Sequence, residues 1–273
     1  MKRFKKVYLE ITNICNMSCS FCHGTKRKKE HMDKAHFDMA LEKLKPYTDY
    51  LYFHLLGEPL CHPHLKGYVE KANNMGFKVS LTTNGTLLDS SIAELPLYKV
   101  SVSLHSFEKT DEEEQTAYLD KVCTFAKKAA ESSILVSFRL WNKGAEGTQN
   151  HITERYLKEA FKDFKEGRNG SFTLDKNIYL EYACRFEWPD INLEEEREEK
   201  FCYGLRDQIG ILADGTVVPC CLDAEGDIAL GNIFKDSLQQ ILSSKKALAI
   251  SEGFSKRQAI ETLCKNCKYA TRF

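Results

Sequence analysis

The chain has 273 residues, and its 39 lysines and arginines balance its 39 aspartates and glutamates. Because a nucleic-acid-binding surface usually needs a basic surplus, this balance argues against a nucleic-acid partner. No apolar run is long enough to cross a membrane, and Glu10, Thr12 and Asn13 interrupt the apolar stretch of any signal peptide. We therefore expect a cytoplasmic protein without a membrane partner.

Apolar, β-rich runs alternate with helical patterns along the first two thirds of the chain. Strands are expected at 6–12, 49–57, 78–85, 99–106, 134–142 and 177–183. Helices are expected at 33–46, 64–76, 110–132 and 154–164. This order implies an α/β fold with a parallel sheet, and six units suit a partial (β/α)6 barrel of the TIM-like type. In such barrels the chemistry lies at the carboxyl ends of the strands.

Eleven cysteines in a reducing compartment need an explanation. Three of them form the run C-x3-C-x2-C at Cys15, Cys19 and Cys22, directly after the first strand. Closed zinc sites and iron–sulfur clusters held by protein alone use four ligands, so three thiols leave one coordination position open. An open position is typical of a catalytic metal site. The alternative is a zinc site in which His23 or another residue is the fourth ligand.

The triad, with the aromatic Phe21 before its third cysteine, resembles the hallmark motif of the radical S-adenosylmethionine (radical SAM) superfamily. The resemblance implies a [4Fe-4S] cluster on Cys15, Cys19 and Cys22, with a fourth iron that binds the amino and carboxylate groups of SAM. It also implies that one electron cleaves SAM into methionine and a 5′-deoxyadenosyl radical, which takes a hydrogen atom from the substrate.

Motifs at the ends of the other strands extend the resemblance and imply further SAM contacts beside Phe21. In this family the motif Gly57, Glu58 and Pro59, after the second strand, binds the methionine amino group. By the same resemblance Asn84 lines the pocket, Ser103 contacts the ribose, and Arg139 pairs with the methionine carboxylate. Two alternatives stay open, because Asn84 also fits an ordinary turn and Arg139 also fits an exposed position.

The tail holds a second cysteine set, made of Cys202, Cys220, Cys264 and Cys267. The Asp-Gly pair in DGTVVPC predicts a hairpin just before Cys220. Four thiols make a closed site, and both zinc and a [4Fe-4S] cluster fit that count. Cys221 is the alternative to Cys220 as a ligand.

This cysteine order, followed by the stretch GNIFKDSLQQIL, resembles the SPASM and twitch auxiliary-cluster domains of radical SAM enzymes. A full SPASM domain carries more cysteines than this tail, so the shorter twitch form fits better. The spacing is similar to that of 2-deoxy-scyllo-inosamine dehydrogenase, and the resemblance implies a second [4Fe-4S] cluster. We expect a radical SAM core at 1–190 and an auxiliary domain at 191–273, with 192–200 as a linker or a solvated helix.

The resemblance implies a radical SAM enzyme of the oxidoreductase type. We expect the net oxidation of a small polar molecule, such as a sugar or cyclitol, with the auxiliary cluster taking the electron of the substrate radical. The alternatives are a peptide-modifying enzyme of the RiPP maturase type and a non-enzymatic iron–sulfur electron carrier. Only 14 residues precede Cys15, too few for a leader-binding domain, which favours the small molecule. The expected electron donor is a reductant such as flavodoxin or ferredoxin, and the motifs single out no catalytic acid or base.

Overall fold

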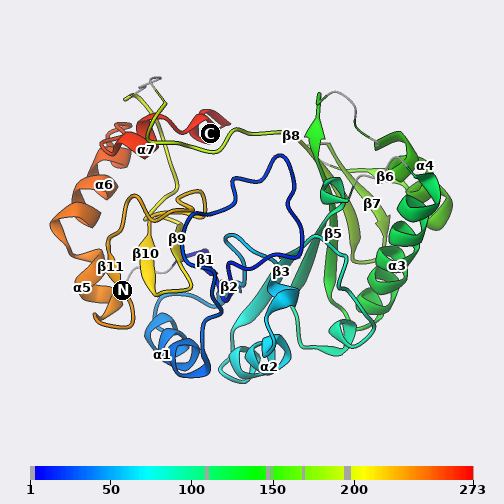
Figure 1. Ribbon diagram of the computed structural model, residues 1–273, viewed down its shortest axis with the longest axis horizontal. Coiled ribbons are helices and arrows are strands. Elements are labelled where there is room, and N and C mark those ends of the chain that lie inside the picture. Colours follow the sequence, from blue (N-terminus) through cyan, green and yellow to red (C-terminus); the bar gives the residue numbers. More distant parts are fainter. Residues whose placement is uncertain are drawn as a thin grey trace. The chain divides into compact units, whose positions relative to one another are not determined.

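The computed structural model describes residues 4–107, 111–145, 148, 150–167, 170–193 and 198–272 (Figure 1). By its internal contacts the chain forms two compact units. The first unit combines the segment up to His62 with the segment from Phe186 onward, and the second unit is Pro63–Arg185. The domain boundary expected between residues 190 and 191 stays a prediction.

The first unit is built on a sheet with the strand order β11–β10–β9–β1–β2. Its strands are β1 (Lys6–Leu9), β2 (Tyr50–Tyr52), β9 (Gln208–Ile211), β10 (Thr216–Val218) and β11 (Gly231–Asn232). β1 pairs in parallel with both β2 and β9, whereas β10 and β11 continue the sheet in antiparallel fashion. The β9–β10 hairpin confirms the expected Asp-Gly turn, in which Gly215 has a φ of 85°. The tail therefore extends the sheet of the first strand.

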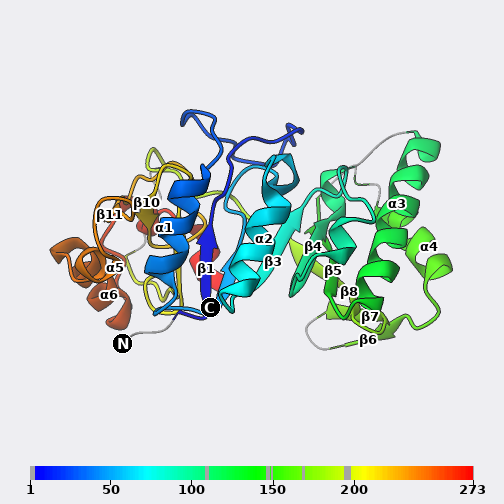
Figure 2. The same cartoon turned by 90° about the horizontal axis from the view of Figure 1, so that it is seen from below.

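Helix α1 (Lys34–Leu44) flanks β1 in the first unit, as Figure 2 shows. The carboxylate of Asp33 caps it by accepting a 2.9 Å hydrogen bond from the backbone N–H of His36. Its buried stripe comprises Phe37, Ala40, Leu41 and Leu44. The helix expected at 33–46 is therefore confirmed. The other helical segments of this unit are η1 (Pro59–Cys61), α5 (Leu238–Leu242), α6 (Lys245–Ser255), α7 (Thr262–Lys265) and η5 (Lys268–Arg272).

The second unit is built on a sheet with the strand order β3–β4–β5–β8–β7–β6. Its strands are β3 (Lys78–Thr83), β4 (Lys99–Ser103), β5 (Leu135–Lys143), β6 (Lys165–Glu166), β7 (Ser171–Asp175) and β8 (Ile178–Cys184). The pairs β3–β4, β4–β5 and β5–β8 are parallel, and the hairpin of β6 and β7 is added in antiparallel fashion.

The helical segments of the second unit are α2 (Leu65–Asn74), η2 (Ile92–Glu94), η3 (Leu104–Ser106), α3 (Glu112–Glu131) and α4 (Asn150–Ala160). Helices α3 and α4 cover one face of the strands β5 and β8 (Figure 1). Asp111 caps α3 with hydrogen bonds of 2.8 and 3.1 Å from the backbone N–H groups of Glu113 and Glu114. Residue 110, where this helix was expected to begin, lies outside the described residues.

The two faces of the second sheet differ in chemistry. Residues alternate along a strand, and Val100, Val102, Val136 and Phe138 are fully buried. In-register positions on the other face carry Thr82, Ser101, Ser103, Ser137, Arg139 and Glu181. This second set is called the polar face below.

The expected α/β class and parallel pairing are confirmed. The six expected strands correspond to β1, β2, β3, β4, β5 and β8, and the described strands of each unit form an open sheet. The β6–β7 hairpin is an addition that the patterns do not predict. Its strands are short, β6 is exposed, and β7 buries only Leu174, so they lack the apolar alternation that marks a half-buried strand.

Replacing Phe37 by alanine tests the packing of α1. Its ring is fully buried and meets Phe53 edge to face, with the ring centroids 5.6 Å apart. We expect Phe37→Ala to lower the free energy of unfolding by about 3–5 kcal/mol in urea titrations followed by circular dichroism. Leu248→Ala is the control, because Leu248 is 55 % exposed and its loss should change stability by about 0.5 kcal/mol or less. Equal effects of the two variants would contradict the packing described here.

Candidate functional site

The first cysteine set lies on the loop between β1 and α1, residues 13–31, here called the cysteine loop. Cys15 and Cys22 are exposed and Cys19 is half-buried. Backbone N–H groups point at two of the sulfurs, from Met17 to Cys15 and from Gly24 to Cys22, each at 3.4 Å. Such N–H donors favour the thiolate that a metal requires.

Asn13 closes the base of the cysteine loop. Its side-chain N–H donates to the carbonyl of Lys28 at 2.8 Å, and its side-chain oxygen accepts from the N–H of Glu30 at 2.8 Å. A bridge between Thr12 and His31 closes the same end. The loop is therefore tied to the end of β1 although its thiols are open to solvent.

The segment 57–59 packs against the cysteine loop. The N–H of Glu58 donates to the carbonyl of Ile14 at 2.9 Å. Gly57 has a φ of 75°, and a Cβ at this position would lie 2.5 Å from the carbonyl oxygen of Thr12. Only glycine fits such a close approach with a positive φ. The buried carboxylate of Glu58 caps η1 by accepting from the N–H of Leu60 at 3.0 Å.

Cys61 lies beside this segment. Burial raises the pKa of its thiol, and the nearby Glu58 and Cys15 raise it further. A second-strand motif and the first thiol of the triad therefore share one neighbourhood. His23, the alternative fourth ligand, lies 3.8 Å from the Glu225 carboxylate, with its ring centroid 5.7 Å from that of Trp188. Phe21 is half-buried.

A buried ion pair holds the first unit together around this loop. Glu10 is fully buried, and its carboxylate accepts from the guanidinium of Arg27 at 2.8 Å. It also accepts from the backbone N–H groups of Leu56 at 3.2 Å and Ala213 at 3.0 Å. Burial raises the pKa of Glu10, although Arg27 and the two N–H groups act to lower it.

In the second unit Arg139 is held on the polar face. Its guanidinium donates to Thr82 Oγ1 at 3.3 Å, and its Nε lies 3.9 Å from the Glu181 carboxylate. The side chain is 18 % exposed, so the alternative of an exposed arginine does not hold. Lys99 also donates to Glu181, at 3.2 Å. Burial acts to raise the pKa of Glu181, but the Ser137 hydroxyl and the charges of Lys99 and Arg139 hold it below its usual range.

Asn84 directly follows β3, and Ser103 is the last residue of β4. The side-chain oxygen of Asn84 accepts from both the N–H (2.9 Å) and the hydroxyl (2.7 Å) of Thr86. This is the geometry of an Asx turn, and the next residue, Gly85, has a φ of 82°. Ser103 is in register with Arg139 across the β4–β5 pair.

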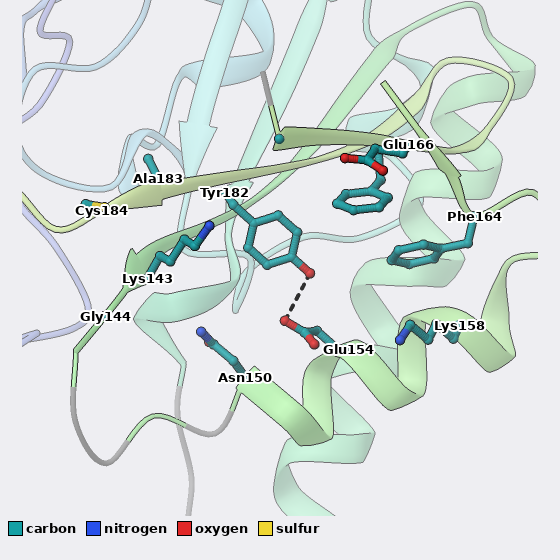
Figure 3. Close-up of a pocket in the computed structure, with 12 residues that line it drawn as sticks. Lys143, Gly144, Asn150, Glu154, Lys158, Phe164, Glu166, Tyr182, Ala183 and Cys184 are labelled. Carbon is teal, nitrogen blue, oxygen red and sulfur yellow. Dashed lines mark hydrogen bonds between the residues drawn. The ribbon is translucent and has the colours of Figure 1, made fainter. Parts of the chain in front are cut away.

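A pocket of about 880 Å³ lies on the helix side of the second unit (Figure 3). The hydroxyl of Tyr182 donates to the Glu154 carboxylate on α4 at 3.0 Å. Burial and then Glu154 raise the pKa of Tyr182. Tyr182 therefore lies on the face opposite to Glu181, and Cys184 lines the same pocket at the exposed end of β8.

The second cysteine set surrounds one cavity of the first unit. This cavity is lined by Cys202, Cys220, Cys264 and Cys267 among others. Burial raises the pKa of Cys220, and the neighbouring thiols Cys221, Cys202 and Cys264 raise it further. Burial likewise raises the pKa of Cys264, and the neighbouring thiols Cys202 and Cys267 raise it further. The four thiols are therefore close enough to interact electrostatically.

Cys221 is placed differently from Cys220. It is half-buried, receives a hydrogen bond from Tyr8 and packs against the apolar cluster that contains Tyr8, Leu55 and Leu212. Cys220 thus lines the cavity, whereas its neighbour packs against the core.

Lys200 is a residue of this site that the sequence patterns miss. It is buried, lines the same cavity, and donates to the backbone carbonyls of Cys264, Lys265 and Cys267. Its backbone pairs with Arg257, and a bridge joins Glu199 to Gln258. Residues 198–200 are therefore extended, so of the two alternatives for 192–200, a linker or a solvated helix, the helix is wrong at these residues. Residues 194–197 lie outside the described part.

The donor sets fit iron–sulfur chemistry. Thiolates are the usual ligands of such clusters, each on its own iron, and the chain offers three on one loop and four around one cavity. Within the described ranges, no group of three or more His, Cys, Asp or Glu side chains is arranged as the ligands of a single metal ion. In the described part of the chain, no helix has the length and apolar character to cross a membrane.

Comparison with known proteins gives two matching family models. Residues 9–142 match the radical SAM superfamily, and residues 202–268 match the SPASM iron–sulfur cluster-binding domain. The sporulation killing factor maturation protein SkfB of Bacillus subtilis is 26 % identical over 273 residues, covering 89 % of this chain and 65 % of SkfB. The chain spans between about a quarter and two thirds of the length of the curated relatives it matches.

Solved structures with the same fold include two proteins with bound ligands. BtrN in complex with AdoMet and 2-DOIA superimposes with a TM-score of 0.60 at 17 % identity, over 98 % of this chain and 94 % of BtrN. Streptococcus suis SuiB bound to the precursor peptide SuiA gives 0.63 at 15 % identity, over 98 % of this chain and 72 % of SuiB. These likenesses show the fold, and the expected partial TIM-like barrel with a C-terminal auxiliary domain is confirmed.

Replacing Gly57 by alanine tests the close approach to the cysteine loop. A positive φ in a residue with a Cβ carries about 1–3 kcal/mol of strain, and the contact with Thr12 adds to it. We expect Gly57→Ala to lower the free energy of unfolding of the iron-free protein by at least that amount. Gly67→Ala is the matched control, because Gly67 lies in α2 with no atom near its Cβ position. It should be neutral or stabilise by about 0.5–1 kcal/mol. Two variants of equal stability would refute the close approach.

Proposed function

The chain carries a radical SAM domain and a SPASM domain and so belongs to the radical SAM superfamily, and on this premise we propose that it oxidises a small polar substrate by hydrogen abstraction. When bound, a [4Fe-4S] cluster with one iron open to SAM supplies the electron that cleaves the sulfonium bond. The observation that carries the proposal is the cysteine loop after β1, which presents three thiols and is packed against Gly57 and Glu58.

We assign Cys15, Cys19 and Cys22 as ligands of the SAM-binding cluster. The backbone N–H groups aimed at two of the sulfurs support the assignment, because they favour thiolates. The fixed base of the loop supports it too, since a cluster needs its ligands in one place.

The proposed SAM contacts are Phe21, Gly57, Glu58 and Pro59 in the first unit and Asn84, Ser103 and Arg139 in the second. For Arg139 the support is electrostatic, since Lys99 and Arg139 share one carboxylate and leave a net positive charge for an anionic group. For Gly57 it is a half-buried backbone that carries no side chain. For Asn84 the side chain already serves a turn, so a backbone contact suits it better.

We assign Cys202, Cys220, Cys264 and Cys267 to an auxiliary [4Fe-4S] cluster. Their position around one cavity supports this assignment. With four thiolates such a cluster has no open iron, so its role is to exchange electrons rather than to bind substrate. Such a cluster would accept the electron of the substrate radical, and the loss of a proton from the substrate would complete a two-electron oxidation. SAM would receive its electron from a reductant such as flavodoxin or ferredoxin.

The choice of substrate rests on two comparisons of different kinds. BtrN, whose complex contains AdoMet and 2-DOIA, matches over nearly the full length of both chains and supports a small polar substrate. A peptide substrate is the second candidate, because SuiB is bound to a precursor peptide and SkfB is a maturation protein. To distinguish the two candidates, cyclitols, sugars or candidate peptides are added to the reduced enzyme and SAM. Only a true substrate should transfer a hydrogen atom to the 5′-deoxyadenosine that forms.

Iron content and SAM cleavage test the proposal directly. Anaerobically reconstituted protein should hold about eight irons per chain, four for each cube. Replacing Cys15, Cys19 and Cys22 together by alanine should leave about four irons and abolish 5′-deoxyadenosine formation with SAM and dithionite. If the parent protein forms no 5′-deoxyadenosine with any reductant, the proposed activity is wrong.

The neighbouring thiols Cys220 and Cys221 form a matched pair of variants. Cys220→Ser should lower the iron content by about four per chain, because it removes a ligand from the cavity. Cys221→Ser should retain the iron and lose only packing and the hydrogen bond from Tyr8. The reverse pattern in iron and sulfide analysis would transfer the ligand role to Cys221.

A further inference from the structure

Lys200 is a buried cation inside the auxiliary-cluster site. Lys200 is 7 % exposed and lines the same cavity as the four cysteines. An ammonium group has three N–H donors and no acceptor. The carbonyls of Cys264 and Cys267 accept from it at 3.2 and 3.1 Å, and the carbonyl of Lys265 accepts as well. Each donor therefore has an acceptor.

These three carbonyls belong to the C-x2-C turn of the second cysteine set. Helix α7 (Thr262–Lys265) ends between the two cysteines. The carbonyl of Cys264 accepts from the backbone N–H of Cys267 at 3.3 Å, and the carbonyls of Lys265 and Cys267 lie at the end of the helix and beyond it. A cation at a helix C-terminus satisfies such carbonyls and interacts favourably with the helix dipole. Asn266 fixes the same turn from another side, since its side-chain N–H donates to the carbonyls of Asp190 and Leu193 at 2.9 and 2.7 Å.

We propose that Lys200 is a positioning residue of the auxiliary cluster, which holds the Cys264–Cys267 turn and raises the reduction potential of the cluster through its positive charge. The inference rests on the proposed assignment of these cysteines to a cluster. Reduction adds one negative charge to a cluster, and a nearby cation stabilises that charge more strongly in a buried site than in water. Burial and local charge are among the factors that set such potentials.

Asp223 is the opposing charge of the cavity. It lines the same space, and its carboxylate accepts from the N–H groups of Asp227 and Ile228 at 2.8 and 2.9 Å. Burial and the thiols Cys202 and Cys267 raise the pKa of the Cys264 thiol most, and the negative charge of Asp223 raises it further. A carboxylate and an ammonium therefore act on the cluster in opposite directions, and the contribution of Lys200 is separable by substitution.

The test uses the full chain with Cys15, Cys19 and Cys22 replaced by alanine, so that only the auxiliary cluster gives a signal. In this background Lys200→Gln removes the charge and keeps an N–H donor, whereas Lys200→Arg keeps the charge. The midpoint potential is measured by a redox titration followed by electron paramagnetic resonance. We expect Lys200→Gln to lower the equilibrium constant for reduction about tenfold, which is about 59 mV for one electron. Lys200→Arg should stay near the parent value.

Lys256→Gln is the matched control, because this lysine is exposed on the same unit and pairs with Glu252. It should leave the potential unchanged.

If Lys200→Gln loads no iron while Lys200→Arg and the control load normally, the positioning role is supported. If both Lys200 variants lose iron while the control retains it, the three-donor geometry is required and the turn-holding role is again supported. Normal loading of Lys200→Gln with the parent potential would overturn the inference. A background protein without about four irons would instead refute the cluster assignment on which it rests.

Discussion

The buried carboxylate of Glu10 is the contact on which the rest of the first unit depends. It joins Arg27 of the cysteine loop, the N–H of Leu56 just before the segment 57–59, and the N–H of Ala213 just after β9. The same Arg27 also donates to the carbonyl of Ala224 in the tail, at 2.9 Å. Breaking a buried pair of this kind leaves an uncompensated charge and typically destabilises by about 3–5 kcal/mol. One carboxylate therefore holds the cysteine loop, the glycine turn and the tail sheet in fixed positions relative to one another.

The two cysteine sets differ in the environment that the chain gives them. In the triad loop, Cys15 and Cys22 are exposed, and backbone N–H groups point at their sulfurs. In the tail, burial raises the pKa values of Cys202, Cys220 and Cys264, so these thiols release their protons less readily than an exposed cysteine does. Metal binding must displace those protons. An exposed set suits a cluster that meets a cofactor, and an enclosed set suits one that only exchanges electrons.

Local patterns in the sequence predict the elements but not their long-range partners. The stripe of Phe37, Leu41 and Leu44 marks α1, because an apolar face repeats with the helical period. Glu10 is visible in the sequence only as a polar interruption of an apolar run, since its partners Arg27 and Ala213 lie 17 and 203 residues away. Lys200 ends a charged stretch that reads as solvated, and its burial follows from extended pairing with residues near 257. The parallel pairing of β9 with β1 is equally non-local, so the hydrophobic pattern of neither segment predicts it.

The polar face of the second unit orders the arginine that we propose to bind an anionic group. A single arginine on a strand has several rotamers, and ordering it for a ligand carries an entropic penalty. Here Glu181 and Thr82 hold the guanidinium of Arg139, and its Cζ lies 4.6 Å from the ring centroid of Trp141. Glu181 would cancel the charge of Arg139 if it were its sole partner, but Lys99 also binds that carboxylate. The face therefore keeps both an ordered guanidinium and a net positive charge, and this combination suits a carboxylate better than an isolated arginine would.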